Sequence, residues 1–415
     1  MTRARTRLTA AIVCLLVVSA PRATPAAIDP LLVLLSFDGW RWDYTDRPEA
    51  LRLRALAARG VRVREMIPAF PALTFPNHYT IVTGLYPAHH GIVANSFLDP
   101  RSRERFSMTT AQKTNPMWWG GEPIWNTAGR QGLRTAALFW PGSEGEIGGM
   151  RPTFWRAYDG ELSAAARIDQ AIDWLRLPAA ERPTFLAVYL EDVDHAGHDY
   201  GPDSPELARA AAVLDQSLGR LVDAIGALQL GDRATIVVVS DHGMTAVSHA
   251  RAIWLEDYID VTRVDVTDWE GTVLLTPKDG TPETVHEMFE RLQHAHPRLH
   301  VFTRETLPAR LHYSNNPRIA PLIGIPDDGW MVTTRARAAQ RREEGRPPLR
   351  GAHGYDPDDR SMHALFVAAG PDVRRGLIVP TLANIDVYGF LCRVLRITPA
   401  PNDGTAAATA GFFRR

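Results

Sequence analysis

The sequence has few cysteines and few lysines for a chain of 415 residues. Its two cysteines are Cys14 and Cys392, and Cys14 lies in an N-terminal segment with the form of a cleavable signal peptide. A mature chain with one thiol forms no internal disulfide, which excludes a small disulfide-held domain. Export without disulfides is ordinary for a bacterial periplasmic protein, and the absence of an Asn-x-Ser/Thr sequon agrees with it.

Long apolar runs are also lacking. Residues 1–26 carry Arg3, Arg5 and Arg7, then the apolar run 8–20 and Pro- and Ala-rich sequence, so we expect a signal peptide. This run is too short to span a bilayer, and no later run is long enough. We therefore expect an exported protein, periplasmic or secreted, without stable membrane insertion. An uncleaved N-terminal anchor is the alternative.

The sequence also has no large excess of positive or negative charge. The formal net charge is −1, and loss of residues 1–26 makes it more negative because this segment holds four arginines and no acid. Nucleic acids and anionic membranes attract strongly basic surfaces. The charge balance therefore argues against a nucleic-acid-binding surface.

Four apolar runs, each followed by polar residues, indicate buried strands. They lie at 31–37, 184–190, 235–239 and 364–368. Continuous apolar strands are typical of a parallel sheet covered on both faces. Helical patterns alternate with them, beginning at Ser204-Pro205 and at Thr281-Pro282. We predict an α/β fold with a doubly wound, mostly parallel central sheet, helices on both faces and ligands beyond the carboxyl ends of the strands.

Strand patterns weaken after the third of these runs. We interpret residues 246–345 as an inserted cap region on a discontinuous core formed by 27–245 and 346–398. The segment 399–415 is rich in Ala, Thr and Gly, so we expect a flexible tail.

Candidate metal ligands follow three of the predicted strands. Asp38 follows the first, and Asp241 and His242 follow the third. A carboxylate and an imidazole at the end of a buried strand are costly unless a partner such as a divalent cation satisfies them. After the second strand, Asp194 and His198 are four residues apart, a spacing that points both side chains at one ion on a helical turn.

A sixth candidate, His353, lies between small residues just before the last strand. Six ligands are more than one tetrahedral zinc uses, so two metal ions fit better than one. A mixed Asp and His set without cysteine suits zinc or another borderline divalent ion and leaves positions open to water or substrate. Local alternatives that could replace single ligands are Asp43, Asp192, His195, Asp199 and His249.

Thr74 is a candidate nucleophile. It lies just ahead of Pro76, which is well placed to open a helix. The positive end of the helix dipole and a nearby cation would both lower the pKa of its hydroxyl. The alternative is that Thr74 only caps the helix.

Seven motifs occur in an order that resembles the nucleotide pyrophosphatase/phosphodiesterase family of the alkaline phosphatase superfamily. They are Ser-Phe-Asp-Gly at 36–39, Thr-Phe-Pro-Asn-His-Tyr at 74–79, Thr-Gly-Leu-Tyr-Pro-Ala-His-His-Gly-Ile-Val-Ala-Asn at 83–95, Trp-Trp-Gly-Gly-Glu-Pro-Ile-Trp at 118–125, Asp-His-Ala-Gly-His at 194–198, Ser-Asp-His-Gly-Met at 240–244 and His-Gly-Tyr at 353–355. The resemblance extends from Leu31 to Leu395. One departure is Pro357, where the family often has Asn.

This resemblance implies an alkaline-phosphatase-like fold and two zinc ions. One zinc would be held by Asp194, His198 and His353, and the other by Asp38, Asp241 and His242, with Thr74 approaching the second ion as nucleophile. Asn95 is similar to a residue that donates to a phosphate oxygen. Phe75 and Tyr158 resemble an aromatic pair that sandwiches a nucleobase.

The implied reaction is hydrolysis of small-molecule nucleotide diesters or phosphoanhydrides to nucleoside 5'-monophosphates through a phosphothreonine-type intermediate. Alternatives on the same metal centre are a phospholipid-type phosphodiesterase, acting on lysophospholipid or glycerophosphocholine, and a phosphomonoesterase. From another class, a non-catalytic zinc-binding protein would also explain the ligands. A sulfatase is excluded, because Thr74 is not in a Cys/Ser-x-Pro-x-Arg sequence.

Overall fold

A computed structural model describes residues 30–269 and 271–414, so the predicted signal peptide at 1–26 lies outside the described residues. The largest element is an eight-stranded sheet with the order β18-β2-β17-β8-β1-β7-β5-β6. Its strands are β1 (Leu31–Phe37), β2 (Val61–Ile67), β5 (Thr135–Leu138), β6 (Phe154–Arg156), β7 (Phe185–Leu190), β8 (Ala234–Val239), β17 (Ala364–Ala369) and β18 (Leu377–Ala383). The four predicted strands are β1, β7, β8 and β17.

Most strands of this sheet run in one direction. The central strand β1 pairs in parallel with both β7 and β8. β17 pairs antiparallel with β8 and with β2, and β2 pairs in parallel with β18. The predicted mostly parallel sheet is therefore confirmed, with β17 as the strand that runs against its neighbours.

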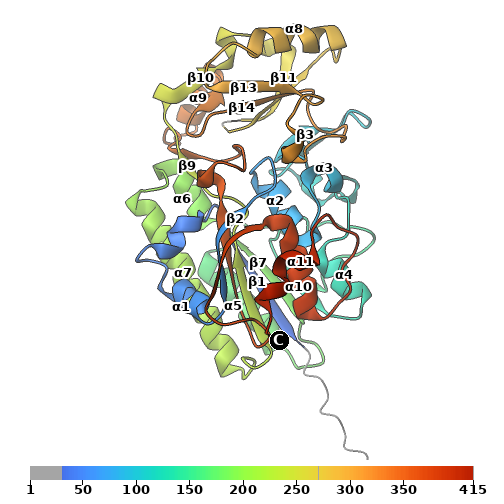
Figure 1. Cartoon of the computed structure of the whole chain (residues 1–415), viewed down its shortest axis with the longest axis vertical. Coiled ribbons are helices and arrows are strands. Elements are labelled where there is room, and N and C mark those ends of the chain that lie inside the picture. Colours follow the sequence, from blue (N-terminus) through green and yellow to red (C-terminus); the bar gives the residue numbers. More distant parts are fainter. Residues whose placement is uncertain (1–29, 270, 415) are drawn as a thin grey trace, which may run out of the picture.

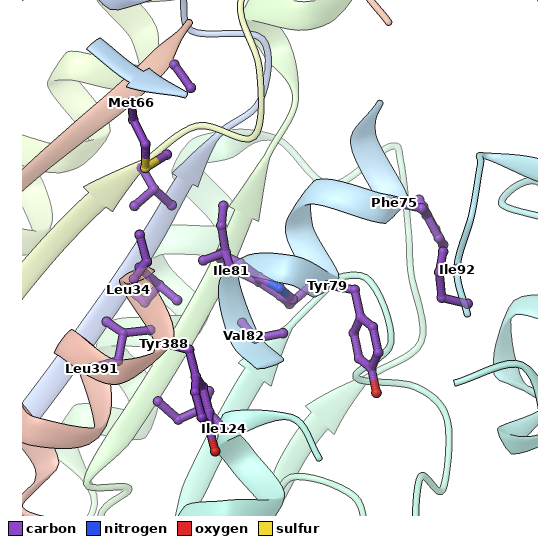
Figure 2. Close-up of a cluster of buried hydrophobic side chains, with 14 of the residues drawn as sticks. Leu34, Met66, Phe75, Tyr79, Ile81, Val82, Ile92, Ile124, Tyr388 and Leu391 are labelled. Atoms are coloured by element: carbon purple, nitrogen blue, oxygen red, sulfur yellow. The ribbon is translucent and has the colours of Figure 1, made fainter. Parts of the chain in front are cut away.

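Helices cover both faces of the sheet. Successive side chains of a strand point to opposite sides, so each face of the sheet has its own apolar cluster. Leu32 and Leu34 of β1 belong to one apolar cluster, and Val33 and Leu35 belong to another. The first cluster includes residues of α2 (Thr74–Thr83), α4 (Ile124–Arg130) and α10 (Val387–Leu395). Figure 2 shows Leu34 beside Ile81 of α2 and Leu391 of α10. The second cluster includes residues of α1 (Leu51–Ala58), α5 (Ala164–Arg176) and α7 (Pro205–Ala227).

Both helices predicted from start patterns are present. At the start of α7, the Ser204 hydroxyl accepts a hydrogen bond of 3.1 Å from the Leu207 backbone N–H, which satisfies a donor that the helix itself leaves unpaired. Thr281 caps α8 (Pro282–Leu292) in the same way, through the backbone N–H of Thr284. Among the helices described, none is both long enough and apolar enough to cross a membrane.

The region after β8 forms a separate layer, at the top of Figure 1. Its antiparallel sheet has the order β11-β12-β14-β13, and α8 packs against it. The strands are β11 (Val264–Asp268), β12 (Val273–Pro277), β13 (Leu299–Thr303) and β14 (Leu322–Pro326). The chain leaves the core at β9 (Thr245–Ala246) and returns at β16 (Gly351–Ala352), and these two strands pair with each other. This pairing supports our proposal that 246–345 is a cap inserted into a core of 27–245 and 346–398.

We predicted a flexible tail at 399–415, but the structure shows its described residues, 399–414, packed against the core. Residues 399–414 include α11 (Ala406–Thr409), and the side chains of Phe412 and Phe413 are buried in the first apolar cluster. Phe413 also forms a bridge with Val373. The prediction depended on the Ala- and Thr-rich composition of the whole segment. Two large aromatic side chains within it are enough to dock it on the core.

Candidate active site

Three buried carboxylates meet at the carboxyl edge of the main sheet. Asp38 follows β1, Asp241 follows β8, and Asp194 lies in α6 (Asp192–Tyr200), which begins directly after β7. Because β1 pairs in parallel with both other strands, the carboxyl ends of all three coincide. The fold therefore brings three carboxyl groups together at one edge of the sheet.

These carboxylates lie among histidines in three overlapping groups that could hold a metal ion, each with ligand atoms within 4.8 Å of one another. The groups are Asp194, His198 and His353; Asp38, Asp194 and His242; and Asp38, His78 and Asp241. All six predicted ligands thus come together. The local alternatives fall outside these groups in the described part of the chain: Asp43, Asp192, His195, Asp199 and His249. Asp43 instead pairs with Arg41, and Asp199 pairs with Arg341.

Three of the histidines are held in one tautomer. The Nδ1 atoms of His198, His242 and His353 each lie 2.9 Å from a backbone carbonyl oxygen. These oxygens belong to Gly351, Gly243 and Ala72, respectively. A carbonyl oxygen only accepts, so each Nδ1 carries the hydrogen and each Nε2 keeps its lone pair. This is the form in which imidazole binds a metal ion through Nε2.

The Nε2 lone pairs face carboxylate oxygens. His242 Nε2 lies 2.9 Å from Asp241 Oδ2 and 3.5 Å from Asp38 Oδ1. Asp194 Oδ1 lies 3.5 Å from His198 Nε2 and 3.7 Å from His353 Nε2. All three of these carboxylate oxygens are buried without a hydrogen-bond donor in the described structure. Two acceptors that face each other at such distances need a cation between them, either a proton or a metal ion.

The pKa values show that these buried groups interact strongly with one another. Burial, together with the charges of Asp241 and Asp194, raises the pKa of Asp38 well above its usual value. Burial also opposes the charge on Asp241, but His242 and His78 outweigh it and hold the pKa of Asp241 well below its usual value. Burial and the charge of His242 lower the pKa of His353 to about 3. His353 is therefore neutral at neutral pH, which is the form that binds a metal.

Thr74 lies at this cluster. It is the first residue of α2, its side chain is 4% exposed, and its Oγ1 lies 3.3 Å from His242 Nε2. The N-cap position belongs to Leu73, whose side chain makes no capping hydrogen bond. The Thr74 hydroxyl is thus directed at the candidate metal ligands and has no capping role.

Asn95 lies next to the start of the same helix. Its Oδ1 accepts a hydrogen bond of 2.9 Å from the backbone N–H of Phe75. This bond fixes the orientation of the amide, because the N–H must point at the oxygen end. The NH2 end of Asn95 is therefore turned away from the Phe75 backbone.

A cavity of about 380 Å3 lies beside Phe75, the residue that follows Thr74. Both predicted aromatic residues, Phe75 and Tyr158, line it, together with Phe139 and Tyr189. The Tyr189 hydroxyl donates a hydrogen bond of 2.6 Å to Asp38 Oδ2. The wall of the cavity is therefore joined directly to the carboxylate cluster.

The Tyr158 side chain is held by a buried ion pair. Its hydroxyl donates a hydrogen bond of 2.9 Å to Glu191 Oε1. Glu191 also accepts from the guanidinium of Arg167, and both of these side chains are buried. Burial and the charge of Glu191 raise the pKa of Tyr158 to about 12, so the hydroxyl keeps its hydrogen and donates.

The sequence prediction missed His78, which lies fully buried beside the cluster. Its Nδ1–H donates to the Thr74 carbonyl oxygen at 2.8 Å and lies 3.3 Å from Asp241 Oδ2, and its Nε2 lies 2.6 Å from the Ser36 hydroxyl. The sequence contains two spacings that place His78 and Ser36 near the candidate site. His78 follows Thr74 by four residues on one helix face, and Ser36 precedes Asp38 by two on one strand face.

Together, the fold and the site define an α/β protein of the alkaline-phosphatase-like class whose sheet edge could bind metal ions. A model of the type I phosphodiesterase / nucleotide pyrophosphatase family matches residues 32–356, so the chain belongs to this family. The predicted resemblance is confirmed.

Relatives of known name agree. Venom phosphodiesterase CdcPDE of Crotalus durissus collilineatus is 37% identical over 383 residues, which cover 90% of this chain and 45% of the relative. Human ectonucleotide pyrophosphatase/phosphodiesterase family member 1 is 38% identical over 391 residues, 92% of this chain and 42% of the relative. The chain thus spans less than half the length of these two relatives.

Solved structures show the same fold. Murine ectonucleotide pyrophosphatase/phosphodiesterase 5, an inactive threonine-to-alanine variant in complex with AMP, superposes with a TM-score of 0.86 at 32% identity. The match covers 93% of this chain and 100% of the murine chain. The human counterpart superposes with a TM-score of 0.86 at 34% identity.

Proposed function

We propose that this protein is a two-zinc phosphodiesterase and pyrophosphatase that hydrolyses nucleotide diesters or phosphoanhydrides to nucleoside 5'-monophosphates. The observation that carries this proposal is the position of the Thr74 hydroxyl, 3.3 Å from His242 Nε2 in the Asp/His cluster, next in the chain to Phe75 of the aromatic cavity. Membership of the family supports it, and so does the AMP bound to the murine relative.

One zinc would be held by Asp194, His198 and His353. The other would be held by Asp38, Asp241 and His242, with the Thr74 oxygen beside it. Two bound cations neutralise charge on the attacking and the leaving oxygen of an in-line phosphoryl transfer. The three unsatisfied carboxylate oxygens and the three Nε2 lone pairs fit this need.

The protein's own groups then perform two displacements. Thr74 Oγ1 gives its proton to water and attacks phosphorus, and the leaving group departs with the electrons of its bond and takes up a proton from water. The product is a phosphothreonine ester at the start of α2, where the backbone N–H groups and the helix dipole favour negative charge. The amide NH2 of Asn95 donates to a non-bridging oxygen. Water attacks the phosphorus next, which releases the nucleoside monophosphate and restores Thr74.

Phe75 and Tyr158 would sandwich the nucleobase in the cavity that both residues line. A flat base can stack between two rings, whereas a choline headgroup would be bound by cation–π contact with their faces. The AMP bound to the murine relative supports a nucleobase as the occupant.

Export is part of the proposal. The relatives named as venom phosphodiesterases and ectonucleotide pyrophosphatases support an extracellular or periplasmic location. The expected signal peptide at 1–26 would direct it.

A comparison of substrates tests the function. We expect a nucleotide diester to be hydrolysed faster than a lysophospholipid or a simple phosphomonoester, with all activity lost on chelation and regained on addition of zinc. Faster turnover of the lysophospholipid or the monoester would select one of the alternative enzymes. Activity indifferent to chelators would contradict the metal centre.

A further inference from the structure

Asn95 lies at the end of an irregular segment of the core. Residues 91–95 connect α3 (Pro87–His90) to the short strand β3 (Ser96–Leu98), and residues 92–94 are fully buried. Buried backbone groups outside helices and strands need hydrogen-bond partners from other parts of the chain. β3 lies against β11 of the cap (Figure 1). The cap is therefore the neighbouring region from which such partners can come.

Two side chains of the cap bind the backbone at and beside Asn95. The Tyr313 hydroxyl donates a hydrogen bond of 2.7 Å to the Val93 carbonyl oxygen, and both residues are buried. Burial and the charge of Asp268 raise the pKa of Tyr313 well above its usual value, so this hydroxyl keeps its hydrogen and donates. The backbone N–H of Asn95 donates to Asp268 Oδ2 at 3.3 Å. The cap thus contacts the backbone that carries the Asn95 amide.

Two further side chains of the cap hold the flanks of the segment. The guanidinium of Arg318 donates to the Gly91 carbonyl oxygen at 3.1 Å and to Asp99 Oδ2 at 2.9 Å. The amide of Asn316 donates to the Ala88 carbonyl oxygen at 2.7 Å. These contacts lie before and after Asn95 in the chain. The cap therefore restrains the segment along its whole length.

The core binds Asn95 through two backbone N–H groups. That of Phe75 donates to the side-chain Oδ1, and that of Met108 donates to the backbone carbonyl oxygen, each at 2.9 Å. The amide NH2 points away from Phe75, so its position depends on where the Asn95 backbone lies. A donor stabilises developing charge best when it is in place before the reaction. Contacts that fix this backbone would therefore set the distance between the amide and a phosphate oxygen.

We propose that the cap is part of the active site, with Tyr313 and Asp268 as positioning residues that hold Asn95 for donation to the phosphate. This inference rests on the proposed function, because it needs Asn95 to bind a non-bridging phosphate oxygen. If the same contacts only joined the cap to the core, their loss would change turnover equally with and without the Asn95 side chain.

The test is a double-mutant cycle on the whole, zinc-loaded protein with the p-nitrophenyl ester of AMP. Asn95→Ala should lower kcat by roughly 10^2-fold, as the loss of one donor to transition-state charge does. Tyr313→Phe keeps the ring and should lower kcat about fivefold with KM near the wild-type value, the effect of one weakened hydrogen bond. When Asn95 is already Ala, Tyr313→Phe should cause no further loss, because the two residues act through one contact.

Asp268→Ala is a second variant, which removes the acceptor of the Asn95 N–H and should give the same pattern as Tyr313→Phe. Tyr388→Phe is the matched control. Its buried hydroxyl lies 2.8 Å from that of Thr127 and joins α10 to α4 within the core, so this variant should keep the wild-type kcat. Thermal unfolding shows whether each variant is folded at the assay temperature.

Three outcomes would contradict the inference in distinguishable ways. An unchanged kcat in both Tyr313→Phe and Asp268→Ala, or an equal loss with and without the Asn95 side chain, would overturn it and leave the proposed function intact. Full activity of Asn95→Ala would overturn it together with the role proposed for Asn95. No hydrolysis of the ester by the wild-type protein would instead overturn the proposed function itself.

Discussion

Two clusters of buried charge lie three residues apart in the chain and have opposite chemistry. Around Asp194, acceptors face acceptors, and three carboxylate oxygens have no donor in the described structure. Around Glu191, donors face acceptors, because Arg167 and the Tyr158 hydroxyl satisfy the carboxylate. The Glu191 cluster is complete as the polypeptide supplies it. The Asp194 cluster is complete only with cations. A complete cluster such as that of Glu191 supports the wall of a pocket. An incomplete cluster such as that of Asp194 could bind a cation.

The largest expected effect concerns the nucleophile beside the incomplete cluster. Thr74→Ala should lower kcat for a nucleotide ester by at least roughly 10^3-fold, since removal of a nucleophile abolishes covalent catalysis. Zinc content, measured by atomic spectroscopy, should remain near two ions per chain. Thr74→Ser keeps a hydroxyl and should recover part of the rate. Full turnover by Thr74→Ala would remove Thr74 from the mechanism.

The complete cluster should matter for stability whether or not metal is bound. Glu191→Gln leaves the buried Arg167 guanidinium without its countercharge and should lower the free energy of unfolding by about 3 kcal/mol. Urea unfolding with zinc and with a chelator would show the same loss in both. Glu181→Gln, at an exposed carboxylate, is the control. A loss seen only with zinc would mean that the two clusters are not distinct.

The incomplete cluster should respond in the opposite way. Asp38→Asn should stabilise the metal-free protein by about 1 kcal/mol, because it removes a buried carboxylate whose pKa is raised. A raised pKa contributes stability below the ordinary value, and that stability is lost as pH rises through the raised pKa. The advantage of the variant should therefore grow as pH rises above about 4, the ordinary range of an Asp side chain. With zinc present the sign should reverse, because a ligand is lost. A variant less stable than wild type without metal would refute the comparison.

The smallest effect concerns Tyr158, whose hydroxyl joins the cavity to the Glu191 cluster. Tyr158→Phe keeps the ring and loses the bond to Glu191, worth about 1 kcal/mol, so KM for a nucleotide ester should rise about fivefold. The kcat should stay near the wild-type value, because the hydroxyl does not reach the phosphorus. A change in kcat with constant KM would mean that Tyr158 acts on the reaction itself.

The central sheet and the grouping of the candidate metal ligands could be predicted from local patterns. Apolar runs that end in Asp38 and in Asp241 place these residues at one edge, since parallel strands share their carboxyl ends. The four-residue spacing of Asp194 and His198 gave the helical pair in α6. These predictions succeed because each depends on a single strand or a single turn.

Predictions that depend on long-range contacts were harder. The buried role of His78 depends on Ser36 and Asp241, which are distant in the sequence, and its four-residue spacing from Thr74 does not by itself distinguish it from a core histidine. The direction of β17 depends on the connections around the cap. The docking of Phe412 depends on a surface formed by other elements. In each case the decisive partner lies far along the chain.

The route of the chain through the cap has a consequence for folding order. Asp38 follows the first strand of the core, whereas His353 arrives only after the chain has passed through the cap and returned along β16. The Asp194 group therefore cannot close until the strand pair β9 and β16 has formed, which requires the ends of a long loop to meet. In the proposed metalloenzyme, metal binding would therefore be a late folding event. Zinc uptake followed during refolding would then report when the core is complete.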